Sequence, residues 1–229
     1  MGCVTVTVPG ASRRTTARWT GRLGLVLLLA GVLLLGFAAW QYLGTNWVSE
    51  RRQHRIVEEL DRGWAAGEVQ VETSGTTAGA VVRIPRFGGG YAVPLLEGTS
   101  GDALAAGIGH LEDTAGPGEA GNFVLAAHRV THGEPFADLP ELRTGDEVYV
   151  DTADRTYVYV VDTDGDAVEV AFDAGWVVAA VPDNPAPGGA EPAQEPGQHL
   201  ITLTTCAELF HTDERLVVFG HLVGSEPRR

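Results

Sequence analysis

A cysteine at the end of a strongly apolar stretch has the setting of a nucleophile. Residues 200–205 read Leu-Ile-Thr-Leu-Thr-Thr, a pattern that predicts a β-strand, and Cys206 follows them directly. Arg215 comes nine residues later and opens a second strand-like stretch. Because adjacent antiparallel strands align their ends, we expect Arg215 to return beside Cys206. A nearby cation lowers the pKa of a thiol, and a guanidinium can hold a carbonyl oxygen or an oxyanion.

The base for such a thiol has to be a histidine, because arginine stays protonated at neutral pH. The 16 basic residues are all arginine, which excludes a lysine nucleophile. His128 ends an apolar strand-like stretch, residues 122–127, where a catalytic group could face a cleft. Spacing alone does not decide among the histidines, and His132 and His211 are the next candidates. The full set is His54, His110, His128, His132, His199, His211 and His221.

An apolar run near the N-terminus predicts a single membrane segment. Residues 23–40 carry no charge, and the run continues to Leu43, a length of roughly 20 residues that crosses a bilayer core. Four arginines precede it: Arg13, Arg14, Arg18 and Arg22. By the positive-inside rule the N-terminus is then cytoplasmic and the rest of the chain extracellular. A cleaved signal peptide, with Gly36-Phe37-Ala38 as the cleavage site, is the alternative.

This placement predicts four segments: a cytoplasmic tail at 1–22, a membrane anchor at 23–43, an extracellular stalk and linker at 44–78, and a catalytic domain at 79–225. Within the stalk, residues 46–67 are expected to be helical, because Ile56, Leu60 and Trp64 share one helix face. The only other cysteine, Cys3, would lie across the membrane from Cys206. A disulfide between them is therefore not expected, and Cys206 is predicted to be a free thiol.

The domain from residue 79 onward is predicted to be mainly β, with few short helices. Short stretches rich in Val, Ile, Thr and Tyr alternate with turn residues, a pattern typical of a small closed barrel. Helical material is limited to residues 101–108 and a turn near 136–142. Asp164-Gly165 predicts a hairpin turn between the fourth and fifth strands. The eight expected strands are 80–84, 122–127, 147–151, 156–163, 167–170, 176–181, 200–205 and 216–222.

The overall composition argues against several functions. The formal charge is −14, which disfavours nucleic acid as a partner, since phosphate binding needs a basic face. Residues 162–166 resemble part of a calcium loop but lack the glycine and glutamate that such a loop needs at its sixth and twelfth positions. We therefore expect no metal site and no cofactor.

Three motifs, taken in order, resemble those of the sortase family. Thr202-Leu-Thr-Thr-Cys206 followed by Arg215 resembles the sortase signature around the catalytic cysteine and arginine. Residues 122–129, with Gly133-Glu-Pro-Phe136 after them, look like the sortase histidine region. Residues 83–98 resemble the first strands of the class E sortases of actinobacteria. The resemblance covers about residues 79–223.

The resemblance implies an eight-stranded barrel and a transpeptidase that uses Cys206 as nucleophile, His128 as general acid and base, and Arg215 as holder of substrate and oxyanion. Thr204, Thr205 and Tyr91 are expected to contact substrate. The substrates would be secreted proteins with a C-terminal Leu-Pro-x-Thr-Gly or Leu-Ala-x-Thr-Gly signal, cut between Thr and Gly. The acceptor would be an amine of a cell-wall precursor of the lipid II type. The loop at 181–199 resembles the one that helps to select the signal.

Two other functions are compatible with the sequence. A pilin-polymerising sortase often carries an N-terminal lid with an Asp-Pro-aromatic motif, which residues 46–79 lack. An inactive, wall-facing binding domain would not need Cys206, His128 and Arg215 together. Cell-wall anchoring is therefore the favoured prediction.

Overall fold

The computed structural model describes residues 16–40, 44–73, 75–194, 197–205 and 213–228. The chain divides into two compact units, residues 1–41 and 42–229. Helix α1, Thr16–Ala39, is the described element of the first unit. The predicted anchor at 23–43 extends past this helix into 41–43, which lie outside the described residues, as does most of the predicted tail. Across the described ranges, no helix combines the length and the apolar character that crossing a membrane requires.

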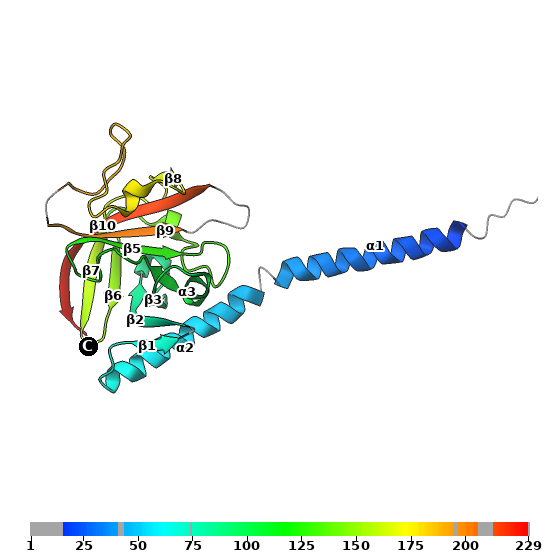
Figure 1. Cartoon of the computed structure of the whole chain (residues 1–229), viewed down its shortest axis with the longest axis horizontal. Helices are drawn as coiled ribbons and strands as arrows, with labels where there is room; N and C mark the ends of the chain where they lie inside the picture. Colours follow the sequence, from blue (N-terminus) through cyan, green and yellow to red (C-terminus); the bar gives the residue numbers. More distant parts are fainter. Residues whose placement is uncertain (1–15, 41–43, 74, 195–196, 206–212, 229) are drawn as a thin grey trace, which may run out of the picture. The chain divides into compact units, whose positions relative to one another are not determined.

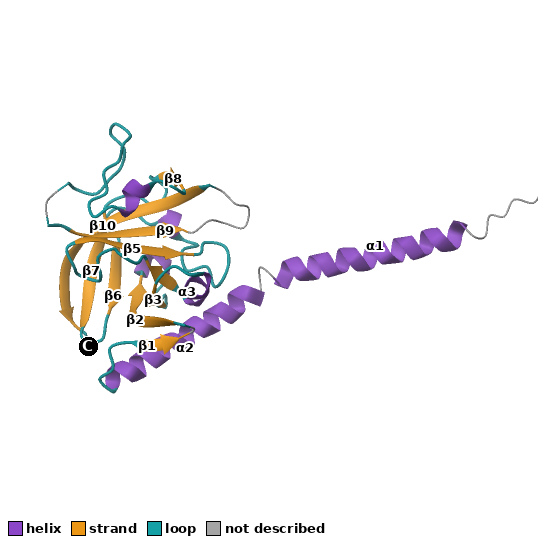
Figure 2. Cartoon of the chain, viewed as in Figure 1, coloured by secondary structure: helices purple, strands orange, loops and turns teal. Residues whose placement is uncertain are grey.

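The second unit is a closed barrel of eight strands (Figures 1 and 2). Around the barrel the strands follow the order β2-β3-β4-β5-β9-β10-β7-β6, and β6 pairs with β2 to close it. The barrel strands are β2 Thr76–Arg83, β3 Val93–Glu97, β4 Ile108–His110, β5 Gly121–Ala127, β6 Glu147–Asp151, β7 Arg155–Val161, β9 His199–Thr205 and β10 Glu214–Pro227. The predicted mainly β, eight-stranded barrel is confirmed.

Two short strands extend the sheet at its sides. Strand β1, Val71–Thr73, pairs with β2, and strand β8, Glu169–Ala171, pairs with β10. The remaining short elements are helix α3 Gly101–Ala106 and the 3₁₀ turns η2 Pro85–Phe87, η3 Leu139–Glu141 and η4 Gly175–Val178. The expected turn near 136–142 thus contains η3.

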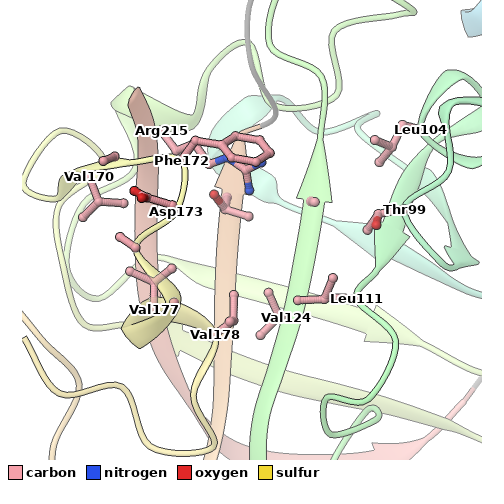
Figure 3. A pocket seen from close by; sticks show the side chains of 15 residues that line it. Thr99, Leu104, Leu111, Val124, Val170, Phe172, Asp173, Val177, Val178 and Arg215 are labelled. Carbon is pink, nitrogen blue, oxygen red and sulfur yellow. The ribbon is translucent and has the colours of Figure 1, made fainter. Parts of the chain in front are cut away.

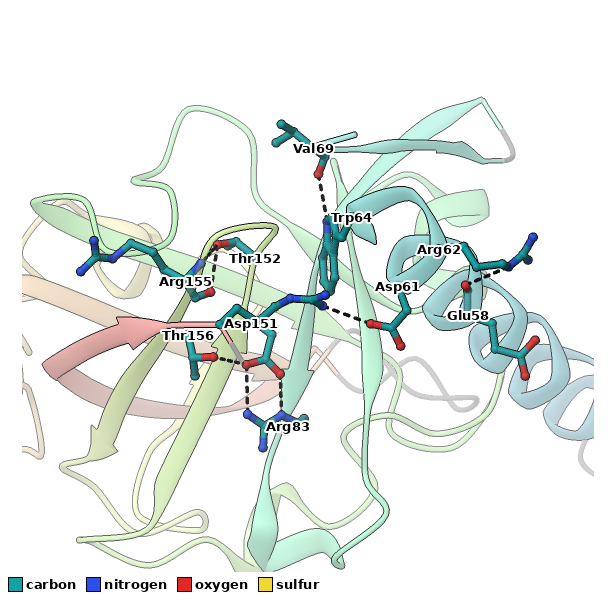
Figure 4. Close-up of polar contacts among 11 residues, drawn as sticks. Glu58, Asp61, Arg62, Trp64, Val69, Arg83, Asp151, Thr152, Arg155 and Thr156 are labelled. Atoms are coloured by element: carbon teal, nitrogen blue, oxygen red, sulfur yellow. Dashed lines mark hydrogen bonds and ion pairs between the residues drawn. The ribbon is translucent and has the colours of Figure 1, made fainter. Parts of the chain in front are cut away.

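The barrel core follows from strand alternation, since successive side chains on a strand point to opposite faces. On β5, Phe123 and Leu125 are fully buried inside the barrel, and Ile201 and Leu203 on β9 lie against them in the same cluster. The intervening residues of β5 and β9 therefore face the outside of the barrel. At the closing pair of strands, Arg83 on β2 and Asp151 on β6 form a two-pronged ion pair (Figure 4).

Helix α2, Thr45–Ala65, packs on the outside of the barrel as part of the second unit. The predicted helix at 46–67 is confirmed, and its expected apolar face is buried: Ile56, Leu60 and Trp64 contact β2, β3 and α3 residues. At the C-terminal end of the helix, Arg228 pairs with Asp61 and covers the Trp64 ring at 4.1 Å (Figure 4). Residues 44–73 and 75–78, expected to be stalk and linker, thus supply α2, β1 and the start of β2.

Two barrel strands were missed by the sequence analysis, β3 and β4. Residues 101–108 were expected to be helical throughout, but α3 ends at Ala106 and Ile108 begins β4. Strands β3 and β4 are parallel and approach closely, so that a Cβ at Gly107 would lie 2.4 Å from the Pro94 carbonyl oxygen. Only glycine fits at that position, and it marks the change from helix to strand.

Two predictions for residues 164–181 were wrong. The segment 176–181 is not a strand but contains the 3₁₀ turn η4, because the buried Asn122 side chain donates to the carbonyl oxygens of Val177 and Ala179. These carbonyls therefore need no partner strand. Strand β8 follows the turn at Asp164-Gly165 but pairs with β10 instead of forming a hairpin with β7.

Candidate active site

The end of one pair of neighbouring strands carries the predicted histidine and leads into the predicted nucleophile. Strands β5 and β9 are parallel, and the last residues of each, Ala127 and Thr205, are partners in the register. His128 follows Ala127 directly. Cys206 follows Thr205 in the sequence and lies outside the described residues, as does His211. The described parts of the two strands therefore finish at the same end of the barrel, Ala127 directly before His128 and Thr205 directly before Cys206 in the sequence.

Arg215 lies at this same end, on strand β10. Strand β10 runs antiparallel to β9, with Val217 opposite Thr204, and the Leu216 amide donates to the Thr205 hydroxyl at 3.3 Å. On its other side Arg215 pairs with Val170 of β8. Its guanidinium carbon stands 3.6 Å from the centre of the Phe172 ring, a distance that supports a cation–π contact. Arg215 therefore lies next to the end of β9, and its predicted place beside Cys206 stays a prediction, because Cys206 lies outside the described residues.

A largely apolar cavity of about 550 Å³ adjoins Arg215 (Figure 3). Its floor is the outer face of β5 and β9, with Val124, Ala126 and Thr204. Residues from α3 and the neighbouring loops form one wall, among them Leu104 and Leu111. The opposite wall comes from β8, η4 and the residues around them: Val170, Ala171, Phe172, Asp173, Ala174, Gly175, Val177 and Val178. A cavity of this size and lining suits an extended peptide with an apolar side chain.

His128 is half-buried, and its pKa is lowered to about 4. Burial is the main cause, because it disfavours the charged imidazolium, and repulsion from His132 adds to it. The two imidazoles stack with centroids 4.8 Å apart and planes 27° from parallel. Burial also lowers the pKa of His132. At neutral pH His128 is therefore neutral, which is the form that can accept a proton from a thiol.

The three residues expected to bind substrate lie in different settings. Thr204 is buried and lines the cavity. Thr205 is buried too, and its hydroxyl accepts the Leu216 amide. The Tyr91 hydroxyl donates instead to the Pro135 carbonyl at 2.7 Å, in the loop that follows His128, and Tyr91 is not among the residues that line the cavity.

Two groups of residues near this site were not singled out from the sequence. Phe172 covers Arg215, but the sequence around Phe172 does not indicate this contact, which depends on the pairing of β8 with β10. Asn46 and Gln53 of α2 reach the loop after His128. Gln53 lies three residues before Ile56 on the buried helix face, and a polar residue on an apolar face was a signal available in the sequence. Among the described residues, no group of His, Cys, Asp or Glu side chains could hold a metal ion.

The family follows from comparison with known proteins. The sortase domain model matches residues 82–223, a range that runs from β2 to β10 and includes His128, Cys206 and Arg215. The chain belongs to the sortase family.

Sortases of class E are among its relatives, which confirms the class predicted from the sequence. Sortase SrtE1 of Streptomyces coelicolor is 33% identical over 218 residues, covering 90% of this chain but 58% of the relative. The structure of sortase E from Streptomyces avermitilis is 37% identical with a TM-score of 0.57, over 66% of this chain and 90% of that one. A structure of sortase E1 from Streptomyces coelicolor with a tripeptide in the active site is 33% identical with a TM-score of 0.54, over 65% and 90% of the two chains.

Proposed function

We propose that this sortase cleaves a C-terminal sorting signal of the Leu-Pro-x-Thr-Gly or Leu-Ala-x-Thr-Gly type between Thr and Gly. It then joins the new Thr carboxyl end to an amine of a cell-wall precursor. The observation that supports the proposal is the register of β5, β9 and β10, which brings Ala127, Thr205 and Arg215 to one end of the barrel, beside the apolar cavity that Arg215 lines. The tripeptide in the active site of the related sortase E1 supports a peptide substrate.

The first half of the proposed reaction makes a thioester. The neutral His128 imidazole takes the proton of the Cys206 thiol as its sulfur attacks the Thr carbonyl carbon. The developing oxyanion is held by the guanidinium of Arg215, which stays charged at every relevant pH. His128 then gives its proton to the departing Gly nitrogen, the Thr–Gly bond breaks, and the Thr acyl group remains on sulfur.

The second half transfers the acyl group. The incoming amine nitrogen attacks the thioester carbonyl carbon, and His128 takes a proton from that nitrogen. The C–S bond then breaks, and His128 gives the proton to the departing sulfur, which restores the Cys206 thiol. The thioester keeps the free energy of the broken peptide bond, so no ATP is needed. The cavity wall formed by β8 and η4 would exclude water from the acyl group, which favours the amine as acceptor.

Phe172 has a supporting place in this scheme. Its ring lies on one face of the Arg215 guanidinium, whereas a substrate carbonyl oxygen would accept from the N–H groups in the plane of that guanidinium. Stacking on an aromatic ring restricts the side chain to one orientation and so reduces the entropy lost when substrate binds.

A cleavage assay tests the proposal. Fluorogenic peptides carrying the Pro and the Ala form of the signal should be cut between Thr and Gly, and a cell-wall amine such as a diamino acid should appear in the product. Cys206→Ala should abolish both steps. Retained turnover in Cys206→Ala would contradict the assignment of the nucleophile.

The membrane location is a separate proposal that rests on the sequence. We propose that residues 23–43 anchor the chain as a single-pass signal anchor, with the arginines of residues 1–22 in the cytoplasm and the catalytic domain outside. Fractionation of cells that express the full chain, compared with a chain starting at residue 44, tests it. The full chain should sediment with membranes and the shortened chain should not.

A further inference from the structure

The loop that follows His128 adopts an uncommon backbone conformation. Three successive residues have positive φ angles: His132 at 56°, Gly133 at 80° and Glu134 at 50°. Residues other than glycine rarely adopt this region, so the loop has an energetic cost that contacts from elsewhere must offset. The His132 ring, on the first of these residues, stacks on the His128 ring.

Helix α2 supplies those contacts. The Gln53 side chain donates to the His132 carbonyl oxygen at 3.1 Å, and the Asn46 side-chain oxygen accepts the Gly133 amide at 3.1 Å. The Asn46 amide group also donates to the Glu134 carboxylate. Gln53 is 6% exposed, and a Cβ at Gly133 would lie 2.8 Å from its Nε2 atom. Helix α2 and the loop therefore pack closely against each other. An isolated hydrogen bond at the surface would not need such close packing.

We propose that α2 positions His128: Asn46 and Gln53 hold residues 132–134, and His132 in turn holds the His128 ring in the orientation needed for proton transfer. This inference rests on the proposed function, in which His128 is the acid and base. Asn46 and Gln53 are positioning residues, because they contact the loop and neither lines the peptide cavity. A displacement of about 1 Å in a reacting group can cost about 100-fold in rate.

The first test separates catalysis from binding. In Asn46→Ala and Gln53→Ala, kcat for peptide cleavage should fall about tenfold while KM changes less than about twofold, because the cavity walls come from other elements. Glu50→Ala is the matched control, since Glu50 is an exposed residue on the same helix and should leave kcat unchanged. Thermal unfolding of each variant shows whether the fold is kept.

A rescue design distinguishes positioning from general stability. Asn46→Asp keeps an acceptor for the Gly133 amide but places a carboxylate beside Glu134, so the loop should be repelled and kcat should fall. Adding Glu134→Gln restores the hydrogen bond with donor and acceptor exchanged. The amide introduced at position 134 then donates to the carboxylate introduced at position 46. The double variant should recover at least half of the wild-type kcat.

A readout that does not depend on activity keeps this inference separate from the proposed function. An NMR titration of the His128 ring should give a pKa near 4 in the wild-type protein and a clearly higher value, toward 6.5, in the double variant Asn46→Ala/Gln53→Ala, because a released loop lets water reach the ring. Failure of the wild-type protein to cleave peptide would refute the proposed function alone. An unchanged His128 titration, an unchanged kcat, or a loss of kcat that the rescue does not reverse would overturn the positioning role.

Discussion

Acidification should inactivate the protein at an unusually low pH. The lowered pKa of His128, about 4 compared with its ordinary value of 6.5, means that the imidazole stays neutral well below neutral pH. Burial of the ring is the first cause of the lowered pKa, and repulsion from His132 is the second. Since only the neutral ring accepts the thiol proton, the acid limb of kcat/KM reports this pKa in the free enzyme.

At about pH 5.5 the lowered pKa changes the neutral fraction of His128 strongly. A histidine with a pKa of 6.5 would be about 90% protonated there, and one with a pKa of about 4 would be about 3% protonated. The two cases differ by about tenfold in the fraction of competent enzyme. His132→Phe keeps a ring against His128 but removes the charge repulsion from His132. The pH midpoint of the acid limb should therefore rise only partway toward 6.5, because His128 stays buried.

The assay is kcat/KM for a fluorogenic sorting peptide measured from about pH 4 to 8. Unfolding has to be separated from inactivation. A histidine whose pKa is lower in the folded state stabilises the fold fully above 6.5, and that stability is lost as the pH falls toward 4. Circular dichroism at each pH identifies any such loss. Half-maximal activity near pH 6.5 in folded protein would refute the account of His128.

Three further predictions concern side chains around the site and the helix. Arg215→Lys should lower kcat/KM at least about 100-fold with the fold kept, because an ammonium cannot reproduce the planar, stacked guanidinium; peptide kinetics and a thermal melt check this. Phe172→Leu should lower kcat/KM about three- to tenfold through a looser Arg215, and an effect larger than that of Arg215→Lys would argue for a different role. Leu60→Ala should lower the free energy of unfolding by about 2–5 kcal/mol in denaturant titrations, because the Leu60 side chain of α2 is fully buried. A loss below about 1 kcal/mol would contradict the packing of that helix on the barrel.

The barrel was predictable where strands carry a clear local pattern. Strand β6 was expected at 147–151 and is found there, and β5, β7 and β9 begin and end within two residues of their expected bounds. Strands β6, β7 and β9 are rich in Val, Ile, Thr and Tyr, and β5 is a short apolar run that is buried almost throughout. Strands β3 and β4 were missed because β3 contains a proline and β4 has three residues, so both depend on their neighbours rather than on local preference.

The site was predictable in part, for a similar reason. The nearness of Arg215 to the end of the cysteine strand followed from antiparallel pairing of two strands joined by a short loop. The role of His128 was inferred from the family resemblance. His128 follows β5, whose partner strand β9 is more than 70 residues away in the sequence, and no local pattern predicts the parallel register of the two strands. The hydrogen bonds of Asn46 and Gln53 to the loop at 132–134 span 79 to 88 residues and could not be read from spacing.

The most direct test of the central claim is the trapping of the thioester. Incubation with a sorting-signal peptide, followed by acid quenching and mass spectrometry of the intact protein, should show the mass of the N-terminal peptide fragment attached at Cys206. Addition of an amine acceptor should remove that mass and produce the joined product. Cleavage of the peptide between Thr and Gly with no adduct at Cys206, or with the adduct on another residue, would contradict the account.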